Sequence, residues 1–134
     1  MKTRAWTTIL VAAVTAIVPW VISPWLTGHR EPWDADGLFY IFALIVTGAA
    51  AGLLTPRPLW AHYLGAFTGQ LAYEIVFLRV GPLFILGALF LLGYCIIFVV
   101  AAAMAAGLRV RLARRAKAAG TGPWREKDGP MKFG

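Results

Sequence analysis

Two titratable side chains, His62 and Glu74, lie inside one long apolar stretch of the sequence, residues 59–80. Ionisable groups within a membrane segment indicate a functional site by default, such as a path for a proton, an ion or a small solute. Their separation of 12 residues corresponds to ~18 Å along a helix. Direct proton exchange needs ~2.6–3.2 Å or one bridging water, so we expect no catalytic pair here.

Three further polar residues, Tyr63, Gln70 and Tyr73, share one side of this predicted helix with His62 and Glu74. We call these five residues the polar stripe. The opposite side carries Leu64, Phe67, Leu71, Ile75 and Leu78. A charged side chain facing lipid costs roughly 2.5–3.5 kcal/mol at mid-membrane, so the stripe must face protein, water or a ligand. Two interpretations follow: hydrogen bonding between helices, or a polar path.

Glycines four residues apart lie on one face of a helix and let a second backbone come close. Gly65 and Gly69 interleave with the polar stripe, and Gly48 and Gly52 form a second pair in the preceding apolar run. Both pairs predict tight helix packing, without identifying the partner helix.

The 134 residues suffice for one domain, and 60% of them are hydrophobic, against ~45–50% in soluble domains. Four apolar runs account for the excess: residues 5–26, 38–54, 59–80 and 83–108. The first run is longer than the ~7–15 apolar residues of a signal peptide, so we expect a retained span. The connecting segments are short. We therefore predict an all-α membrane protein with four transmembrane helices in an up-down-up-down bundle.

The distribution of basic residues predicts the orientation of this bundle. With both termini cytoplasmic, only Arg30 and Arg79 of the 13 Lys and Arg residues fall on the outer side. Cytoplasmic loops carry such an excess of Lys and Arg. The simplest location is the bacterial inner membrane, crossed several times.

A basic tail, residues 109–134, follows the fourth run, and its second half is rich in Gly and polar residues, which indicates a partly flexible end. Its first half carries five cations: Arg109, Arg111, Arg114, Arg115 and Lys117. Beside a membrane, each contributes ~1 kcal/mol of attraction to anionic headgroups. This lipid contact explains the charge, so we expect no nucleic-acid partner.

Several kinds of chemistry lack their motifs. The sequence has no Cys or His cluster with zinc spacing, no phosphate-binding loop and no nucleophile elbow. A haem held by two histidines of one chain needs a second intramembrane His, and His62 is the only one. Cys95 is the sole cysteine, so a thiol pair within one chain is excluded. Asp34 and Asp36 in the first loop do not make a counted ligand set. We expect no metal, no cofactor and no enzymatic activity.

Two functions remain. The leading hypothesis is an accessory or assembly subunit, which packs through the small and polar faces of its second and third spans against itself or a larger membrane complex. The alternative is a small oligomeric channel or transporter, with a polar path along the third span centred on Glu74.

Overall fold

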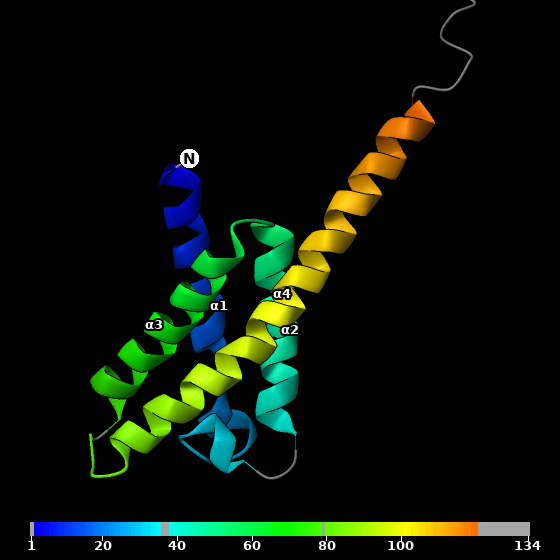
Figure 1. Ribbon diagram of the computed structural model, residues 1–134. Coiled ribbons are helices and arrows are strands. Elements are labelled where there is room, and N and C mark those ends of the chain that lie inside the picture. Colours follow the sequence, from blue (N-terminus) through cyan, green and yellow to red (C-terminus); the bar gives the residue numbers. More distant parts are fainter. Residues whose placement is uncertain (1, 36–37, 79, 121–134) are drawn as a thin grey trace, which may run out of the picture.

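The computed structural model describes residues 2–35, 38–78 and 80–120, and those residues form an all-helical chain without strands. The helices, in order, are α1 (Lys2–Leu26), the short 3-10 helix η1 (Pro32–Asp34), α2 (Phe39–Leu54), α3 (Leu59–Phe77) and α4 (Phe84–Gly120) (Figure 1). The all-α class expected from the sequence is therefore confirmed.

The helix ends differ from the predicted ends of the spans. α1 remains helical through Pro19 and Pro24, and α3 ends three residues before the predicted Val80. The largest difference is in α4, which does not stop at Leu108 but includes the whole basic segment as far as Gly120. Residues 121–134, predicted to be flexible, lie outside the described residues.

Figure 1 shows that the helices alternate in direction, so that the start of α1 and the end of α4 lie at the same end of the molecule. α1 packs chiefly against α3, and α2 packs chiefly against α4. Further contacts join α3 to α4 and α1 to α2. Although a turn of only four residues, 55–58, connects α2 to α3, these two helices lie diagonally across the assembly rather than side by side.

All four α-helices contribute to one hydrophobic core. It contains Ala12, Ala16, Tyr40, Leu44, Ala51, Ala66, Cys95 and Phe98. Half of these side chains are alanine, which lets the helix backbones approach closely while the larger side chains fill the remaining space.

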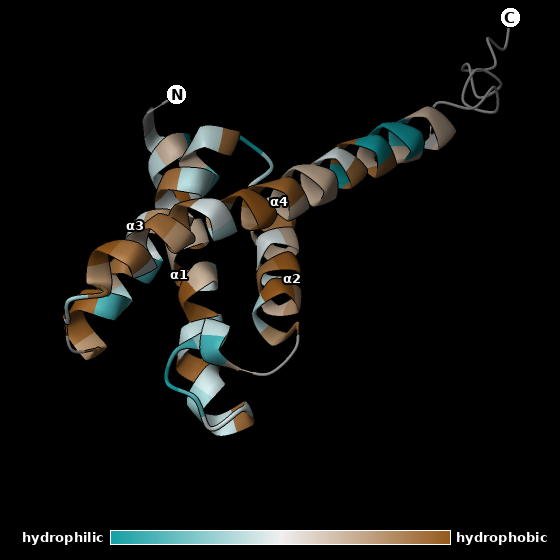
Figure 2. Cartoon of the chain, turned by 60° about the horizontal axis from the view of Figure 1, so that its bottom comes forward, coloured by the Kyte–Doolittle hydropathy of each residue, from teal (hydrophilic) through white to brown (hydrophobic). Residues whose placement is uncertain are grey.

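Each of the four α-helices exposes large apolar side chains. Val14, Val46, Val76 and Ile85, one on each α-helix, are 66%, 66%, 70% and 73% exposed. Soluble monomers rarely expose contiguous apolar patches of more than a few hundred Å². Figure 2 shows apolar residues over the first part of α4 and hydrophilic residues near its end.

Two of the described helices, α1 and α4, are long and apolar enough to cross a membrane. α2 is also apolar but has 16 residues, which corresponds to ~24 Å. α3 has 19 residues, and its apolar sequence is interrupted by polar residues of the stripe. Length and composition alone therefore support membrane association through two helices.

Candidate functional site

Gln70 is the centre of a buried hydrogen-bond network that joins all four α-helices. Its Oε1 accepts hydrogen bonds from Trp20 Nε1 at 3.1 Å and from the hydroxyl of Tyr40. Its Nε2 donates to Cys95 Sγ at 3.7 Å. The indole N–H can only donate, so the carbonyl side of the amide must face Trp20. Trp20, Gln70 and Cys95 are fully buried, and Tyr40 is 3% exposed.

Aromatic rings enclose this network on the side toward η1. The ring centroid of Trp20 lies 4.7 Å from that of Trp33 in an edge-to-face arrangement, and Tyr40 lies 4.7 Å from Tyr94. Such pairs contribute ~0.5–1.5 kcal/mol beyond the area they bury. The stripe residue Tyr73 contacts Trp20 from α3, with 5.8 Å between their centroids. The rings therefore fix the positions of the groups that bond Gln70.

His62 is also fully buried, and it holds the turn between α2 and α3. Its Nδ1 lies 3.1 Å from the carbonyl oxygen of Pro58, and its Nε2 lies 3.3 Å from Thr55 Oγ1. A carbonyl can only accept, so Nδ1 carries the proton of the first bond. Thr8 of α1 donates to the carbonyl of Arg57 in the same turn at 3.1 Å. These bonds give His62 a structural role within the chain.

Tyr63 forms a hydrogen bond to the backbone of α4. Its hydroxyl donates to the carbonyl oxygen of Leu92 on α4 at 3.1 Å. Three of the five stripe residues, Tyr63, Gln70 and His62, therefore form hydrogen bonds to another helix or to the α2–α3 turn.

The predicted glycine pairs pack inside the chain. A Cβ at Gly48 or Gly52 would meet the backbone of α4, at Phe98 and Ala102 respectively. A Cβ at Gly69 would lie 2.7 Å from the carbonyl oxygen of Ala13 on α1, and one at Gly65 would meet Ile9 of the same helix. The close approach predicted from the spacing is therefore present, and its partners are α4 and α1.

Glu74 differs from the rest of the stripe because one carboxylate oxygen has no polar partner. The residue is 8% exposed, and its Oε2 is buried without a hydrogen bond to any described residue. The side chain lines a pocket of about 540 Å³ between η1, the end of α3 and the start of α4. Glu31 and Asp34 line the same pocket, which gives it three carboxylates.

The structure thus divides the stripe into three separate environments. His62 bonds the α2–α3 turn, Gln70 bonds the central network, and Glu74 borders the pocket. The partners of these residues on other elements could not be identified from the sequence, because no periodicity within one helix reveals which neighbour it meets. The sequence hints at these partners only in that Trp20, Tyr40 and Cys95 each carry a polar atom within an apolar run.

Four arginines of α4 occupy three kinds of position. Arg109 donates from Nη1 to the carbonyl oxygens of Leu53 and Leu54, at 3.0 Å for Leu54, and so caps the end of α2. Arg111 and Arg114 line a pocket of about 260 Å³ together with Arg57 from the α2–α3 turn. Arg115 is exposed. Only part of the predicted lipid-binding set is therefore grouped into a shared cationic surface.

No group of three His, Cys, Asp or Glu side chains that could hold a metal ion occurs within residues 2–35, 38–78 and 80–120. Comparisons of the chain with protein-family models, with curated proteins and with solved structures found no match. A functional assignment therefore rests on the geometry described above.

Proposed function

We propose that the protein is a multi-pass bacterial inner-membrane protein in which all four α-helices cross the bilayer and both termini are cytoplasmic. The apolar outward faces of α1 to α4, their alternating direction and the concentration of Lys and Arg at one end support this arrangement. α2, at ~24 Å, is shorter than a hydrocarbon core of ~30 Å, and local thinning of the bilayer accommodates such a mismatch.

Within that membrane we propose an accessory or assembly role, in which the protein binds a transmembrane helix of a larger partner. The small and polar faces of α2 and α3 are already covered by α4 and α1, so the partner would use a different surface. The observation that carries the proposal is a groove of about 780 Å³ between α2 and α4. Its lining is apolar throughout: Ile45, Ala49, Ile96, Ile97, Val100, Ala101, Met104, Ala105 and Leu108.

The shape of this groove suits a helix. Ala49, Ala101 and Ala105 are among its lining residues, and small residues let a second helix approach closely in a membrane. Met104 is 72% exposed and is an adaptable side chain that packs against varied surfaces. A helix seated in the groove would bury side chains that otherwise face lipid.

The test is gentle detergent extraction of the tagged protein from its native membrane, followed by mass analysis of the purified complex. We expect one membrane protein to be recovered in stoichiometric amount. Ala49→Leu, which fills the groove, should reduce this recovery at least severalfold. Ala50→Leu is the matched control, because Ala50 is exposed on the same helix and does not line the groove.

Recovery of the same partner with both variants would exclude the groove as the binding surface. Recovery of the chain without any partner would contradict the accessory role.

The cationic end of the molecule supports a further part of this proposal, contact with anionic lipid at the cytoplasmic face. Arg57, Arg111 and Arg114 gather around one pocket, and guanidinium groups bind phosphate through paired N–H donors. Each such residue near the surface contributes ~1 kcal/mol of attraction.

A channel or transporter is the second candidate, and Glu74 is the observation that favours it. Ionisable side chains within membrane segments mark ion and solute pathways, and Glu74 borders a pocket and has one buried carboxylate oxygen without a described partner. A path onward to His62 would require the Gln70 network to open. In liposomes, loss of solute flux in Glu74→Gln with unchanged assembly would support this candidate over the accessory role.

A further inference from the structure

The pocket beside Glu74 has the composition of a cation-binding site. It lies where η1, the end of α3 and the start of α4 meet, and its volume is about 540 Å³. Glu31, Asp34 and Glu74 line it, while Lys, Arg and His are absent from its described lining. The field inside the pocket is therefore negative, which favours a positively charged ligand.

The Glu74 carboxylate supplies the independent sign of a ligand. The side chain is more than nine-tenths buried, and Oε2 makes no hydrogen bond to any described residue. A buried carboxylate without a partner is unfavourable, because the protein must replace the hydration that it loses. A cation bound in the pocket would stabilise this carboxylate through its charge, without contacting the enclosed Oε2.

The walls indicate what kind of cation fits. Trp33, Phe84 and Phe90 line the pocket, and an aromatic face attracts a cation within about 6 Å. The Trp33 ring is held in place, since its Nε1 donates to Glu31 Oε2 at 2.7 Å and it packs with Trp20 in an edge-to-face arrangement. Leu83 and Leu86 add apolar surface. Carboxylates beside rigid aromatic rings suit an organic ammonium rather than a bare metal ion, whose ligands must converge on one point.

Gly87 makes room for the ligand on the α4 side. A Cβ at this position would lie 3.0 Å from Glu74 Oε1 and 3.8 Å from the ring of Trp33. A methyl group there would crowd the carboxylate, whereas its distance from the Trp33 ring is an ordinary van der Waals contact. Glycine therefore leaves space beside the Glu74 carboxylate.

We propose that this pocket binds a small organic cation, whose ammonium group pairs with Glu74 and whose apolar body packs against Trp33 and Phe90. The proposal does not depend on the accessory role, because the pocket and the α2–α4 groove share no lining residue.

The experiment is calorimetric titration of the full chain in lipid nanodiscs with phenyltrimethylammonium, compared with its neutral isostere tert-butylbenzene. We expect saturable binding of one ammonium per chain, at least about tenfold tighter than that of the isostere, given typical strengths of ion-pair and cation–π contacts. Glu74→Gln should weaken binding of the ammonium by about tenfold or more, and Trp33→Leu by several fold.

Two glycine variants on α4 provide a matched pair. Gly87→Ala should weaken binding, whereas Gly93→Ala should bind as the wild type does, because a Cβ at Gly93 meets nothing within 4 Å. Circular dichroism of each variant checks that the helices are retained, so that loss of binding is not loss of folding.

Three results would overturn the proposal. Equal binding of the ammonium and its isostere would show that charge is not recognised. Displacement of the ammonium by equimolar Na⁺ would identify an inorganic cation site instead. Absence of binding in the wild type, with binding restored in Arg79→Gln, would show that Glu74 is neutralised by the chain's own guanidinium.

Discussion

Gln70 Oε1 on α3 lies 3.1 Å from Trp20 Nε1 on α1, deep in the interior where both side chains have no exposed surface. The residues are 50 positions apart, and the same oxygen also accepts the hydroxyl of Tyr40 on α2. One amide therefore fixes the relative positions of three helices, and its Nε2 reaches Cys95 on the fourth. At its centre, the polar stripe therefore forms hydrogen bonds that connect the four helices.

Gln70→Leu should destabilise the fold, because it leaves the Trp20 and Tyr40 donors buried without an acceptor. We expect a loss of roughly 1–3 kcal/mol in the free energy of unfolding, measured in detergent by denaturant titration. Thr68→Val is the matched control on the same helix, since the Thr68 hydroxyl is exposed and bonds only its own helix. A loss of equal size in the control would show that Gln70 has no special role.

Gly52→Ala should push α2 and α4 apart, because the added Cβ would meet the backbone at Ala102, which cannot rotate away. Such overpacking typically costs about 1–3 kcal/mol. Gly107→Ala adds the same methyl group where nothing lies within 4 Å, so its melting temperature should be near that of the wild type or above it. Thermal unfolding followed by circular dichroism compares the two variants. Similar melting temperatures would contradict close packing at Gly52.

Arg109→Gln should loosen the last turn of α2, because its guanidinium caps the carbonyls of Leu53 and Leu54. Loss of such a contact at a helix C-terminus costs about 0.3–1 kcal/mol. Hydrogen exchange at the amides of that turn should accelerate by several fold. Arg115→Gln, which removes the same charge from an exposed position on α4, should leave those exchange rates unchanged.

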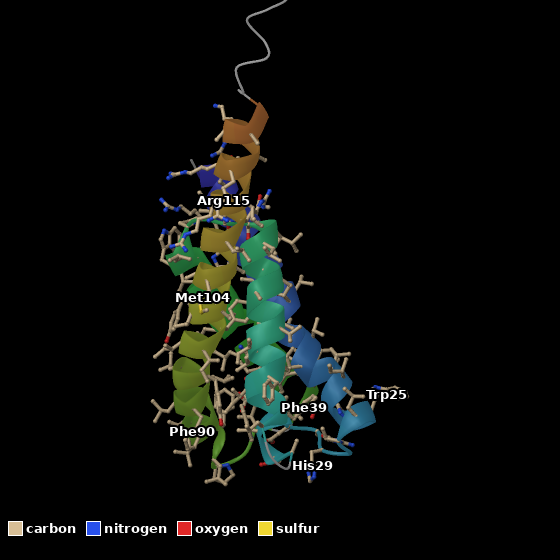
Figure 3. The ribbon with its side chains drawn as sticks, turned by 90° about the vertical axis from the view of Figure 1, so that its right-hand side faces the viewer. Trp25, His29, Phe39, Phe90, Met104 and Arg115 are labelled. Carbon is tan, nitrogen blue, oxygen red and sulfur yellow. The ribbon has the colours of Figure 1, made fainter. Side chains whose placement is uncertain are left out.

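Cysteine labelling in intact cells tests the proposed orientation. His29 and Arg115 lie toward opposite ends of the molecule (Figure 3), and both are exposed. A membrane-impermeant maleimide should label His29→Cys at once and Arg115→Cys only after the cells are opened. The native Cys95 is fully buried and serves as the unlabelled background. The reverse pattern would invert the topology.

In each of these pairs of variants, the control makes a comparable substitution at a position that lacks the contacts of the test residue. Gly107 tests the effect of a methyl group on a helix, and Thr68 tests the effect of losing a polar atom.

The sequence by itself determined the all-helical class, the approximate extent of the four apolar helices and the two-sided character of α3. These properties follow from local periodicity and from the cost of exposing polar groups to hydrocarbon, so they need no knowledge of the neighbours. The spacing of Gly48 and Gly52, and of Gly65 and Gly69, likewise predicted close approach.

Only the tertiary structure decided which helices meet. Gln70 acquires its role from Trp20, Tyr40 and Cys95, and Glu74 acquires a pocket from η1 and α4. Although a turn of only four residues connects α2 to α3, their glycine faces pack against α4 and α1 respectively. The physical reason is that packing energy depends on the complementarity of surfaces far apart in the chain, which no local pattern records.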